Sequence, residues 1–332
     1  MGDRHVAIVA EIGSVHDGSF GNAVRLVETA AACGADAVKF QLHLPEAEST
    51  RDAPSPPYFS AEPRFEYFAR TGFSKDQWAR IASSCAEAGV EFVCSAFSIE
   101  AVAILEDVGV SRHKVASGEV TNLPLLEAMA STGKPVLLSS GMSSWAELDA
   151  AVDVLRSGGP VTVLQCTSQY PCPPERVGLN VIAEMAARYA LPVGFSDHTS
   201  GNEAAIAAVA LGASVVEKHL TFSKRMYGSD APNAAEPEQM TELCRSIRAV
   251  ERMLENQVDK DDISPYAEMK RIFEKSIVVL ESLEAGTVLT AEMLGCKKPG
   301  TGIAPSQLSA IVGRRLARPV AADAVLQEGD LA

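Results

Sequence analysis

The chain has 332 residues, of which 47% are hydrophobic, and its formal net charge at pH 7 is −14. An acidic balance without any basic run argues against nucleic acid or an anionic membrane surface as a partner. No apolar run reaches the roughly 18 residues of a membrane span, and the N-terminus lacks a signal-peptide pattern, so we expect a cytoplasmic protein.

Seven cysteines are scattered along the chain without a Cys-x-x-Cys pair. An odd, irregular set of this kind predicts reduced thiols and not a disulfide framework. Cys94 and Cys166 lie within apolar, strand-like runs, which indicates that they pack in the core.

Short apolar, β-branched runs alternate with alanine-rich helical stretches over the first two thirds of the chain. Alternation of strand and helix builds a parallel sheet, and eight such units ending near residue 220 predict an α/β fold, a (β/α)₈ TIM barrel. Several helical stretches end in glycine just before the next strand, as C-caps do. The predicted strands are 6–12, 36–41, 90–95, 113–117, 135–140, 161–166, 192–196 and 214–219.

Two segments depart from the strand–helix alternation. Residues 43–73, rich in proline and serine, form a long connection that we interpret as a lid or rim insertion. After the last predicted strand the chain changes character, with glycine and proline punctuating short segments. We therefore predict a barrel domain (1–255), a polar linker (256–270) and a small second domain (271–332) with little helix.

The ends of the predicted strands carry an unusual set of polar residues. Active sites of such barrels lie where strands end and βα loops begin. Because side chains alternate along a strand, Glu217 and His219 share one face and Lys218 takes the other. If the first two point into the barrel, Lys218 points toward the surrounding helices.

Two histidines, His198 and His219, stand at the ends of the last two predicted strands. Two imidazoles from adjacent strand ends suit Mn²⁺, Zn²⁺, Fe²⁺ or Co²⁺ and leave coordination positions for water and a substrate oxygen. The alternative is a pair of hydrogen-bonded core histidines.

Lysines and serines converge on the same end of the barrel from five different strands. Ammonium groups with hydroxyls and glycine-rich backbone form a cradle for phosphate or carboxylate. The alternative is that each lysine is salt-bridged and each serine caps a helix. The residues concerned are Lys39, Lys114, Ser117, Ser139 and Ser196.

At this point the sequence resembles the sialic acid synthase family, whose members carry a C-terminal antifreeze-like (SAF) domain. The motifs that carry the resemblance are "AEIG", "HDG", "KFQ", "KVASGE", "LLSSGM", "CTSQYP", "GFSDHTSG", "ALGASVVEKHLT" and "KKPGTGI". They occur in the family's order over nearly the whole chain. The resemblance implies condensation of phosphoenolpyruvate with an open-chain aldose, such as an N-acetylhexosamine, to a 2-keto-3-deoxy sugar acid and phosphate.

The resemblance also implies a role for each matching residue. His198 and His219 would hold a divalent cation, Mn²⁺ ahead of Mg²⁺ or Co²⁺. Phosphoenolpyruvate would be bound by Lys39, Lys114, Ser117, Ser139, Ser168, Tyr170 and Ser196. The sugar would be bound by Glu11, His16, Gln41, Asp230 and Lys298. The catalytic residues would be Glu11, Lys114, Glu119 and Asp230. The tail of each subunit would cap its partner's barrel, which implies a domain-swapped homodimer.

The departures from the family pattern fall mainly on the acceptor side. The first loop reads Val-His-Asp-Gly at 15–18 in place of Asn-His-Asn-Gly, and Ser-Asp-Ala at 229–231 replaces Pro-Asp-His. Lys298 stands where the family has an arginine, and a lysine lacks the planar, multi-donor geometry of a guanidinium. Ser168 replaces a frequent asparagine. These differences predict that the reaction type is kept and that the acceptor differs from N-acetylmannosamine.

Two other functions remain open at this stage. The first is an aldolase that joins free pyruvate to an aldehyde through a Schiff base on Lys39 or Lys114. The second is a family member without catalysis that binds a sugar or a phosphate.

Overall fold

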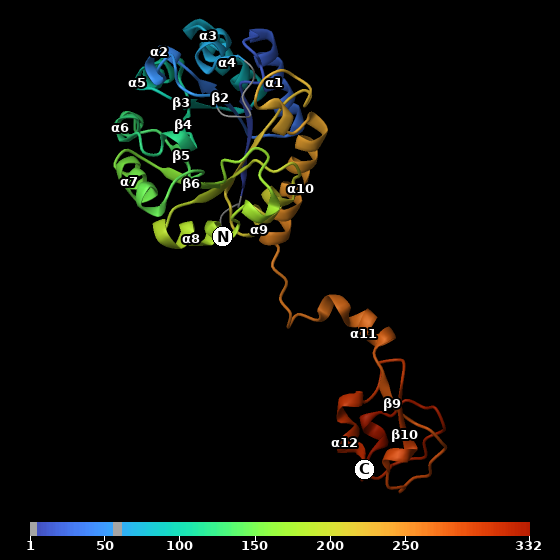
Figure 1. Cartoon of the computed structure of the whole chain (residues 1–332). Coiled ribbons are helices and arrows are strands. Elements are labelled where there is room, and N and C mark those ends of the chain that lie inside the picture. The colour runs from blue at the N-terminus through green and yellow to red at the C-terminus, as the bar shows by residue number, and fades with distance from the viewer. Residues whose placement is uncertain (1–4, 56–61) are drawn as a thin grey trace. The chain divides into compact units, whose positions relative to one another are not determined.

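The structure, a computed structural model, describes residues 5–55 and 62–332. The chain divides into two compact units, the first ending at Asn256 and the second beginning at Gln257. The first unit is a closed barrel whose eight parallel strands follow chain order, with β8 paired to β1 (Figure 1), and this confirms the predicted TIM barrel. The strands are β1 (Ala7–Gly13), β2 (Ala37–Leu42), β3 (Glu91–Ala96), β4 (Arg112–Val115), β5 (Val136–Ser139), β6 (Val161–Cys166), β7 (Val193–Asp197) and β8 (Val215–His219).

Helices surround the barrel and pack on the outer side of its strands (Figure 1). They are α1 (Phe20–Cys33), α4 (Lys75–Ala88), α5 (Ile99–Val108), α6 (Leu123–Ser131), α7 (Trp145–Arg156), α8 (Asn180–Tyr189), α9 (Glu203–Ala210) and α10 (Pro237–Glu255). Gly34, Gly89 and Gly109 end three of these helices with φ of +91°, +74° and +86°, as the glycine pattern predicted. Only glycine adopts this left-handed conformation without strain.

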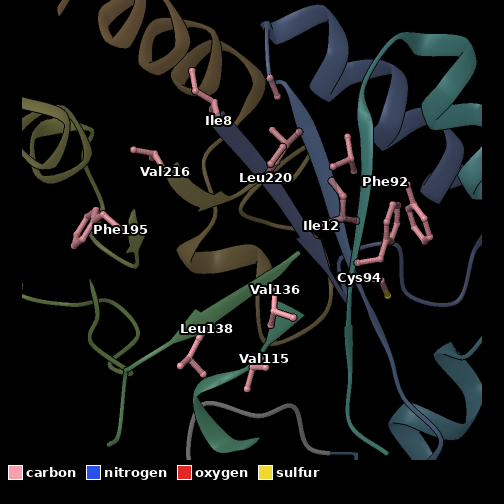
Figure 2. Packing of buried hydrophobic residues seen from close by; sticks show 14 of the residues in the cluster. Ile8, Ile12, Phe92, Cys94, Val115, Val136, Leu138, Phe195, Val216 and Leu220 are labelled. Atoms are coloured by element: carbon pink, nitrogen blue, oxygen red, sulfur yellow. The ribbon is translucent and has the colours of Figure 1, made fainter. Parts of the chain in front are cut away.

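The apolar core has two layers, separated by the alternation of side chains along each strand. The outer layer lies between strands and helices, and Figure 2 shows part of it, including Ile8, Phe92 and Leu138. A smaller cluster from the alternate positions, with Val9, Val93 and further residues, fills the inside of the barrel. The outward faces of the strands are therefore mostly apolar, and the inward faces mix apolar and polar residues.

The described parts of the predicted rim insertion, 43–73, contain the helices α2 (Pro45–Glu48) and α3 (Arg64–Thr71). Three of the four buried residues of α3 are aromatic: Phe65, Tyr67 and Phe68, beside Thr71. Residues 56–61, which belong to the same prediction, lie outside the described part of the chain. The described parts of the insertion contribute side chains to the pocket discussed below.

The second unit has its own small core and short elements. They are a 3₁₀ turn (Ser264–Tyr266), α11 (Ala267–Phe273), β9 (Ser276–Val279), the antiparallel β10 (Leu294–Lys297) and α12 (Leu308–Ile311). Ile277, Leu289 and Leu326 are among its fully buried residues. The predicted linker, 256–270, thus contains helical turns and ends inside α11. Among the described residues, no helix is both long and apolar enough to span a membrane.

Candidate active site

Four charged side chains meet inside the barrel, each from the inward face of a strand. Lys39 Nζ lies 2.8 Å from Glu11 Oε2 and 3.6 Å from Glu217 Oε1. Lys114 Nζ lies 4.0 Å from the same Glu217 oxygen. All four residues are at least 95% buried, because the strand ends and the loops above them exclude solvent. The two lysines and two glutamates form a charge-balanced cluster that holds both ammonium groups in place.

The environment moves the pKa values of the two lysines in opposite directions. Burial alone would lower the pKa of Lys39, but Glu11 and Glu217 outweigh this effect and raise it above its usual value. Burial lowers the pKa of Lys114 below its usual value, since its single carboxylate neighbour is more distant. Lys39 is therefore a permanent cation, whereas Lys114 is the more easily deprotonated amine.

The predicted serines surround this cluster. Lys114 Nζ donates to Ser139 Oγ at 2.6 Å, and Ser196 Oγ donates to Glu217 Oε1 at 3.3 Å. Ser117 Oγ accepts from the Gly141 N–H at 3.1 Å. A Cβ atom on Gly141 would lie 2.3 Å from Ser168 Oγ and 2.5 Å from Ser117 Oγ. The Gly141 backbone and the two hydroxyls therefore lie so close together that no side chain fits at this position.

A pocket of about 230 Å³ opens at the ends of the strands. It is lined by Ser14, Gln41, His43, Arg64, Phe68, Phe97, Ala116, Ser117, Gly118, Met142, Ser168, Tyr170, His219, Ser229 and Asp230. Gln41 Nε2 donates to Glu11 Oε1 at 2.6 Å and so connects the pocket to the buried charge cluster. Lys39, Lys114, Ser139 and Ser196 do not line the pocket and lie deeper in the barrel.

Asp230 lines the pocket, and Glu119 follows the lining residue Gly118 in the chain. Asp230 Oδ2 accepts the Ser14 N–H at 2.9 Å, and a Cβ on Gly13, whose φ is +52°, would come within 2.4 Å of that oxygen. Glycine is required at this position for its backbone conformation and for the close approach. Glu119, which follows the pocket residue Gly118, is half-buried, and burial raises its pKa. A carboxyl group with a raised pKa is suited to donate a proton.

The two histidines of the predicted metal site are neighbours, with ring centroids 5.8 Å apart. His198 Nδ1 is bonded to the Thr167 carbonyl oxygen at 2.9 Å, which leaves Nε2 for another ligand. Among the described residues, His219 Nδ1 is a buried nitrogen without a hydrogen-bond partner. One ion at about 2.1 Å from a nitrogen of each ring would fit this separation. The described residues contain no group of three or more His, Cys, Asp or Glu side chains arranged for a metal, so protein ligands beyond the two imidazoles are not in evidence.

Of the residues assigned to the sugar, one is buried beside the loop after β1 and another belongs to the C-terminal unit. His16 is buried behind the pocket, where its ring packs 4.6 Å from the Phe73 ring and Nδ1 accepts the Gly18 N–H. Lys298 belongs to the C-terminal unit, and its ammonium lies 5.0 Å from the centre of the Phe273 ring. In the described structure His16 shapes the loop after β1 and does not line the pocket.

We expect His16 to make the free energy of unfolding depend on pH. Burial lowers its pKa from 6.5 to about 4, so the folded protein keeps the ring neutral where the unfolded chain protonates it. This stabilisation is complete above pH 6.5 and is lost as the pH falls toward 4. Replacing His16 with Asn, which preserves an acceptor for Gly18, should reduce the loss of stability between pH 7 and pH 5 by about 2 kcal/mol. Urea unfolding of both proteins at the two pH values measures the difference, and equal losses would contradict the assignment.

Three residues at the site were not predicted from the sequence. His43 is stacked between Phe68 and Phe97, at centroid distances of 3.6 and 4.1 Å. Cys166, expected to pack in the core, has its Sγ 3.9 Å from His198 Nδ1. Arg64 reaches the pocket from the first turn of α3. His43 stands two residues after Gln41, and Cys166 stands two residues after Leu164, so the alternation of inward-facing residues could have indicated both. The sequence carries no comparable signal for Arg64.

The sequence of this chain matches two protein-family models and several named synthases. The model of the NeuB family matches residues 26–259, and that of the SAF domain matches residues 274–332. The N-acetylneuraminate-9-phosphate synthase of Mus musculus is 35% identical over 99% of this chain and 93% of its own length. The N,N'-diacetyllegionaminic acid synthase of Campylobacter jejuni is 31% identical over 98% of this chain and its whole length.

A solved structure of a related synthetase also resembles this chain. The crystal structure of the N-acetylneuraminic acid (sialic acid) synthetase from Leptospira borgpetersenii, in complex with citrate, superposes with a TM-score of 0.73 at 29% identity. It covers 81% of this chain and 92% of that protein. These findings confirm the resemblance recognised in the sequence and the assignment of the C-terminal unit to the SAF type.

Proposed function

The chain belongs to the NeuB family, and from this premise we propose that it condenses phosphoenolpyruvate with an aldose. The reaction consumes one water and yields a 2-keto-3-deoxy sugar acid and inorganic phosphate. The observation that carries the proposal is a pair of buried lysines, Lys39 and Lys114, that lie deeper in the barrel than a pocket lined by Ser117, Ser168 and His219. The named synthases among its relatives support a reaction of this type.

The chain's own residues account for the steps of this reaction. Lys39, Lys114 and the serine hydroxyls would hold the phosphate and carboxylate of phosphoenolpyruvate, so that its C3 faces the aldehyde carbon. As C3 attacks, positive charge develops at C2, where the buried carboxylates of Glu11 and Glu217 stabilise it. Water would add to C2 as Glu11 takes one of its protons, and the C2–O bond to phosphate would then break to form the keto group, the second water proton leaving with the phosphate. Glu119, with its raised pKa, would protonate the new alkoxide.

The cluster alone is poorly matched to a polyanion, because its two ammonium groups are already balanced by two carboxylates. A divalent cation held by His198 and His219 would add positive charge for phosphoenolpyruvate and polarise the acceptor's aldehyde oxygen. Tyr170, whose ring lies 4.1 Å from that of His198, would fix the orientation of this imidazole. Mn²⁺ is the ion we propose, with Mg²⁺ and Co²⁺ as alternatives.

A homodimer is the proposed assembly. The segment that joins the two units carries apolar side chains that are exposed in the C-terminal unit. They are Ile263, Tyr266, Met269, Ile272 and Phe273. Burying them against a second copy would remove apolar surface from water, which supports an exchange of C-terminal units between partners.

Phosphate release tests the proposed reaction. Purified protein with phosphoenolpyruvate, Mn²⁺ and a panel of N-acetylhexosamines and other aldoses should release phosphate only when an acceptor is present. Replacing Gly141 with Ala should lower kcat/KM for phosphoenolpyruvate about a hundredfold, since the new Cβ displaces the two hydroxyls. Gly21→Ala is the matched control, because its Cβ would meet only Ser19 Oγ, at 3.9 Å.

Other outcomes would replace the proposal. Consumption of pyruvate without phosphate release, with borohydride trapping of a lysine, would establish the Schiff-base aldolase. Absence of phosphoenolpyruvate binding would exclude the proposed reaction altogether.

A further inference from the structure

A series of hydrogen bonds runs from the rim insertion to the buried carboxylate of Glu11. Glu48, the last residue of α2, has its Oε1 2.8 Å from His43 Nδ1. His43 Nε2 lies 3.1 Å from Gln41 Oε1, and Gln41 Nε2 donates to Glu11 Oε1 at 2.6 Å. Gln41 and His43 line the pocket, whereas the side chains of Glu11 and Glu48 are 1% and 4% exposed. The four side chains thus connect the insertion to the charge cluster inside the barrel.

The carboxylate of Glu11 determines the direction of this series. Since a carboxylate only accepts, the group of Gln41 that meets it is the amide nitrogen, and the amide oxygen then faces His43. His43 Nε2 must carry a proton to donate to that oxygen. With the amide turned by half a rotation, two oxygen acceptors would face each other at Glu11, where a hydrogen bond of 2.6 Å now lies. The N–H at His43 Nε2 therefore selects a single orientation of the Gln41 amide.

The imidazole of His43 is itself held on its edges and on its faces. Phe68 and Phe97 stack on the ring with interplanar angles of 19° and 17°. Glu48 Oε1 bonds to Nδ1 of the ring, and the other oxygen of that carboxylate accepts the Leu44 N–H at 3.2 Å. Both ring nitrogens are thus engaged by the protein, so His43 acts on the reaction through the neighbour that it contacts.

The orientation of the Gln41 amide matters because of what Glu11 does in the proposed reaction. Glu11 takes a proton from the water that adds to C2, which requires its carboxylate to stay in one place. Gln41 binds one of the carboxylate oxygens, and Lys39 Nζ lies 2.8 Å from the other. Without His43 the amide of Gln41 could turn, and the carboxylate of Glu11 would then be held from one side only.

We propose that His43 is a positioning residue for catalysis: it fixes the Gln41 amide and, through it, the Glu11 carboxylate that removes a proton from water. Glu48 and the two phenylalanines hold the His43 ring in the position that this role requires. The inference rests on the proposed function and adds to it a residue that acts without touching the reacting atoms.

Two variants of equal charge separate the contacts of His43. Glutamine at this position can place its amide nitrogen where Nε2 lies, so His43→Gln keeps a donor to Gln41 and loses the contact with Glu48. Asparagine can place its amide nitrogen where Nδ1 lies, so His43→Asn keeps the contact with Glu48 and loses the donor to Gln41. Neither amide is aromatic, so both variants lose the stacking on Phe68 and Phe97 alike. A difference between them therefore reports the hydrogen bond to Gln41.

Phosphate release with phosphoenolpyruvate, Mn²⁺ and the aldose of the panel that gives the highest wild-type rate measures this difference. His43→Asn should lower kcat about 30-fold, while KM for phosphoenolpyruvate changes less than about threefold, because the base is misplaced and the bound anion is not. His43→Gln should keep kcat within about fivefold of the wild type. His43→Phe, which preserves the stacking and neither hydrogen bond, should lose as much kcat as His43→Asn.

Glu46→Gln is the matched control, since Glu46 lies on the same helix α2, is exposed and binds Arg51. All variants are compared at a temperature at which thermal unfolding shows them to be folded. Equal kcat values for His43→Asn and His43→Gln, or a His43→Phe variant as active as the wild type, would overturn the inference, as would a loss confined to KM. Failure of the wild type to release phosphate with any aldose would instead refute the proposed function.

Discussion

Replacing His219 with Ala should abolish stoichiometric Mn²⁺ binding and lower kcat about a thousandfold, equivalent to about 4 kcal/mol of transition-state stabilisation. The structure brings His219 next to His198 and leaves its buried Nδ1 without a hydrogen-bond partner among the described residues. With His198 and His219 as the proposed ligands, loss of one leaves a single imidazole to hold the ion, which should weaken binding strongly.

Equilibrium dialysis with Mn²⁺ and phosphate-release kinetics on the same preparation measure both effects. His5→Ala is the control, because His5 is exposed and lies far from the pocket residues in the fold. An active His219→Ala protein that turns over without metal would refute the assignment of the two histidines as ligands.

Replacing Lys218 with Met should lower the free energy of unfolding of the barrel by about 3–5 kcal/mol. Lys218 Nζ lies 2.7 Å from Asp197 Oδ2 and donates to the Thr199 carbonyl at 3.0 Å, and both charged side chains are almost fully buried. Methionine fills a similar volume but leaves the Asp197 carboxylate without its counter-charge. In the sequence, His198 stands between Asp197 and Thr199, the two partners of Lys218. The same change should therefore loosen His198, which we propose as a metal ligand.

A double variant separates the charge effect from packing. Asp197→Asn combined with Lys218→Met removes both charges, while the amide oxygen can still accept the Thr199 N–H that Asp197 Oδ1 accepts at 2.8 Å. It should recover most of the stability that the single variant loses. Urea unfolding followed by tryptophan fluorescence reports the barrel alone, since Trp78 and Trp145 lie in α4 and α7. If the free energy of unfolding of Lys218→Met were within about 1 kcal/mol of the wild-type value, the Lys218–Asp197 pair would not be required for stability.

Much of the site could be predicted because the alternation of side chains between the two faces of a strand depends only on the local backbone. Side chains alternate regardless of the rest of the fold, so the positions of Glu217 and His219 on one face and Lys218 on the other followed from the sequence alone. The structure confirms this arrangement: Glu217 joins the interior cluster, and Lys218 pairs with Asp197 on the opposite side. The motif order likewise predicted the family and the two domain types, which the comparisons confirm.

The pairing of the charges was not predictable in the same way. That Lys39 faces Glu11 and Glu217, and that Lys114 faces Glu217, depends on how β1, β2, β4 and β8 are staggered when the barrel closes. No residue's immediate neighbours determine that stagger. The sequence allowed an anion cradle, which stays a prediction, whereas the structure shows the two lysines in a charge-balanced cluster with two glutamates.

The sequence by itself determined which elements form, in what order, and which strand residues face the interior, because these features depend on local backbone geometry and on side-chain periodicity. Only the tertiary structure decided that His16 packs behind the pocket and that Arg64 of the insertion lines it. Both outcomes depend on contacts between segments far apart in the chain. Such contacts form only once the barrel has closed and the aromatic residues of α3 have packed against its rim.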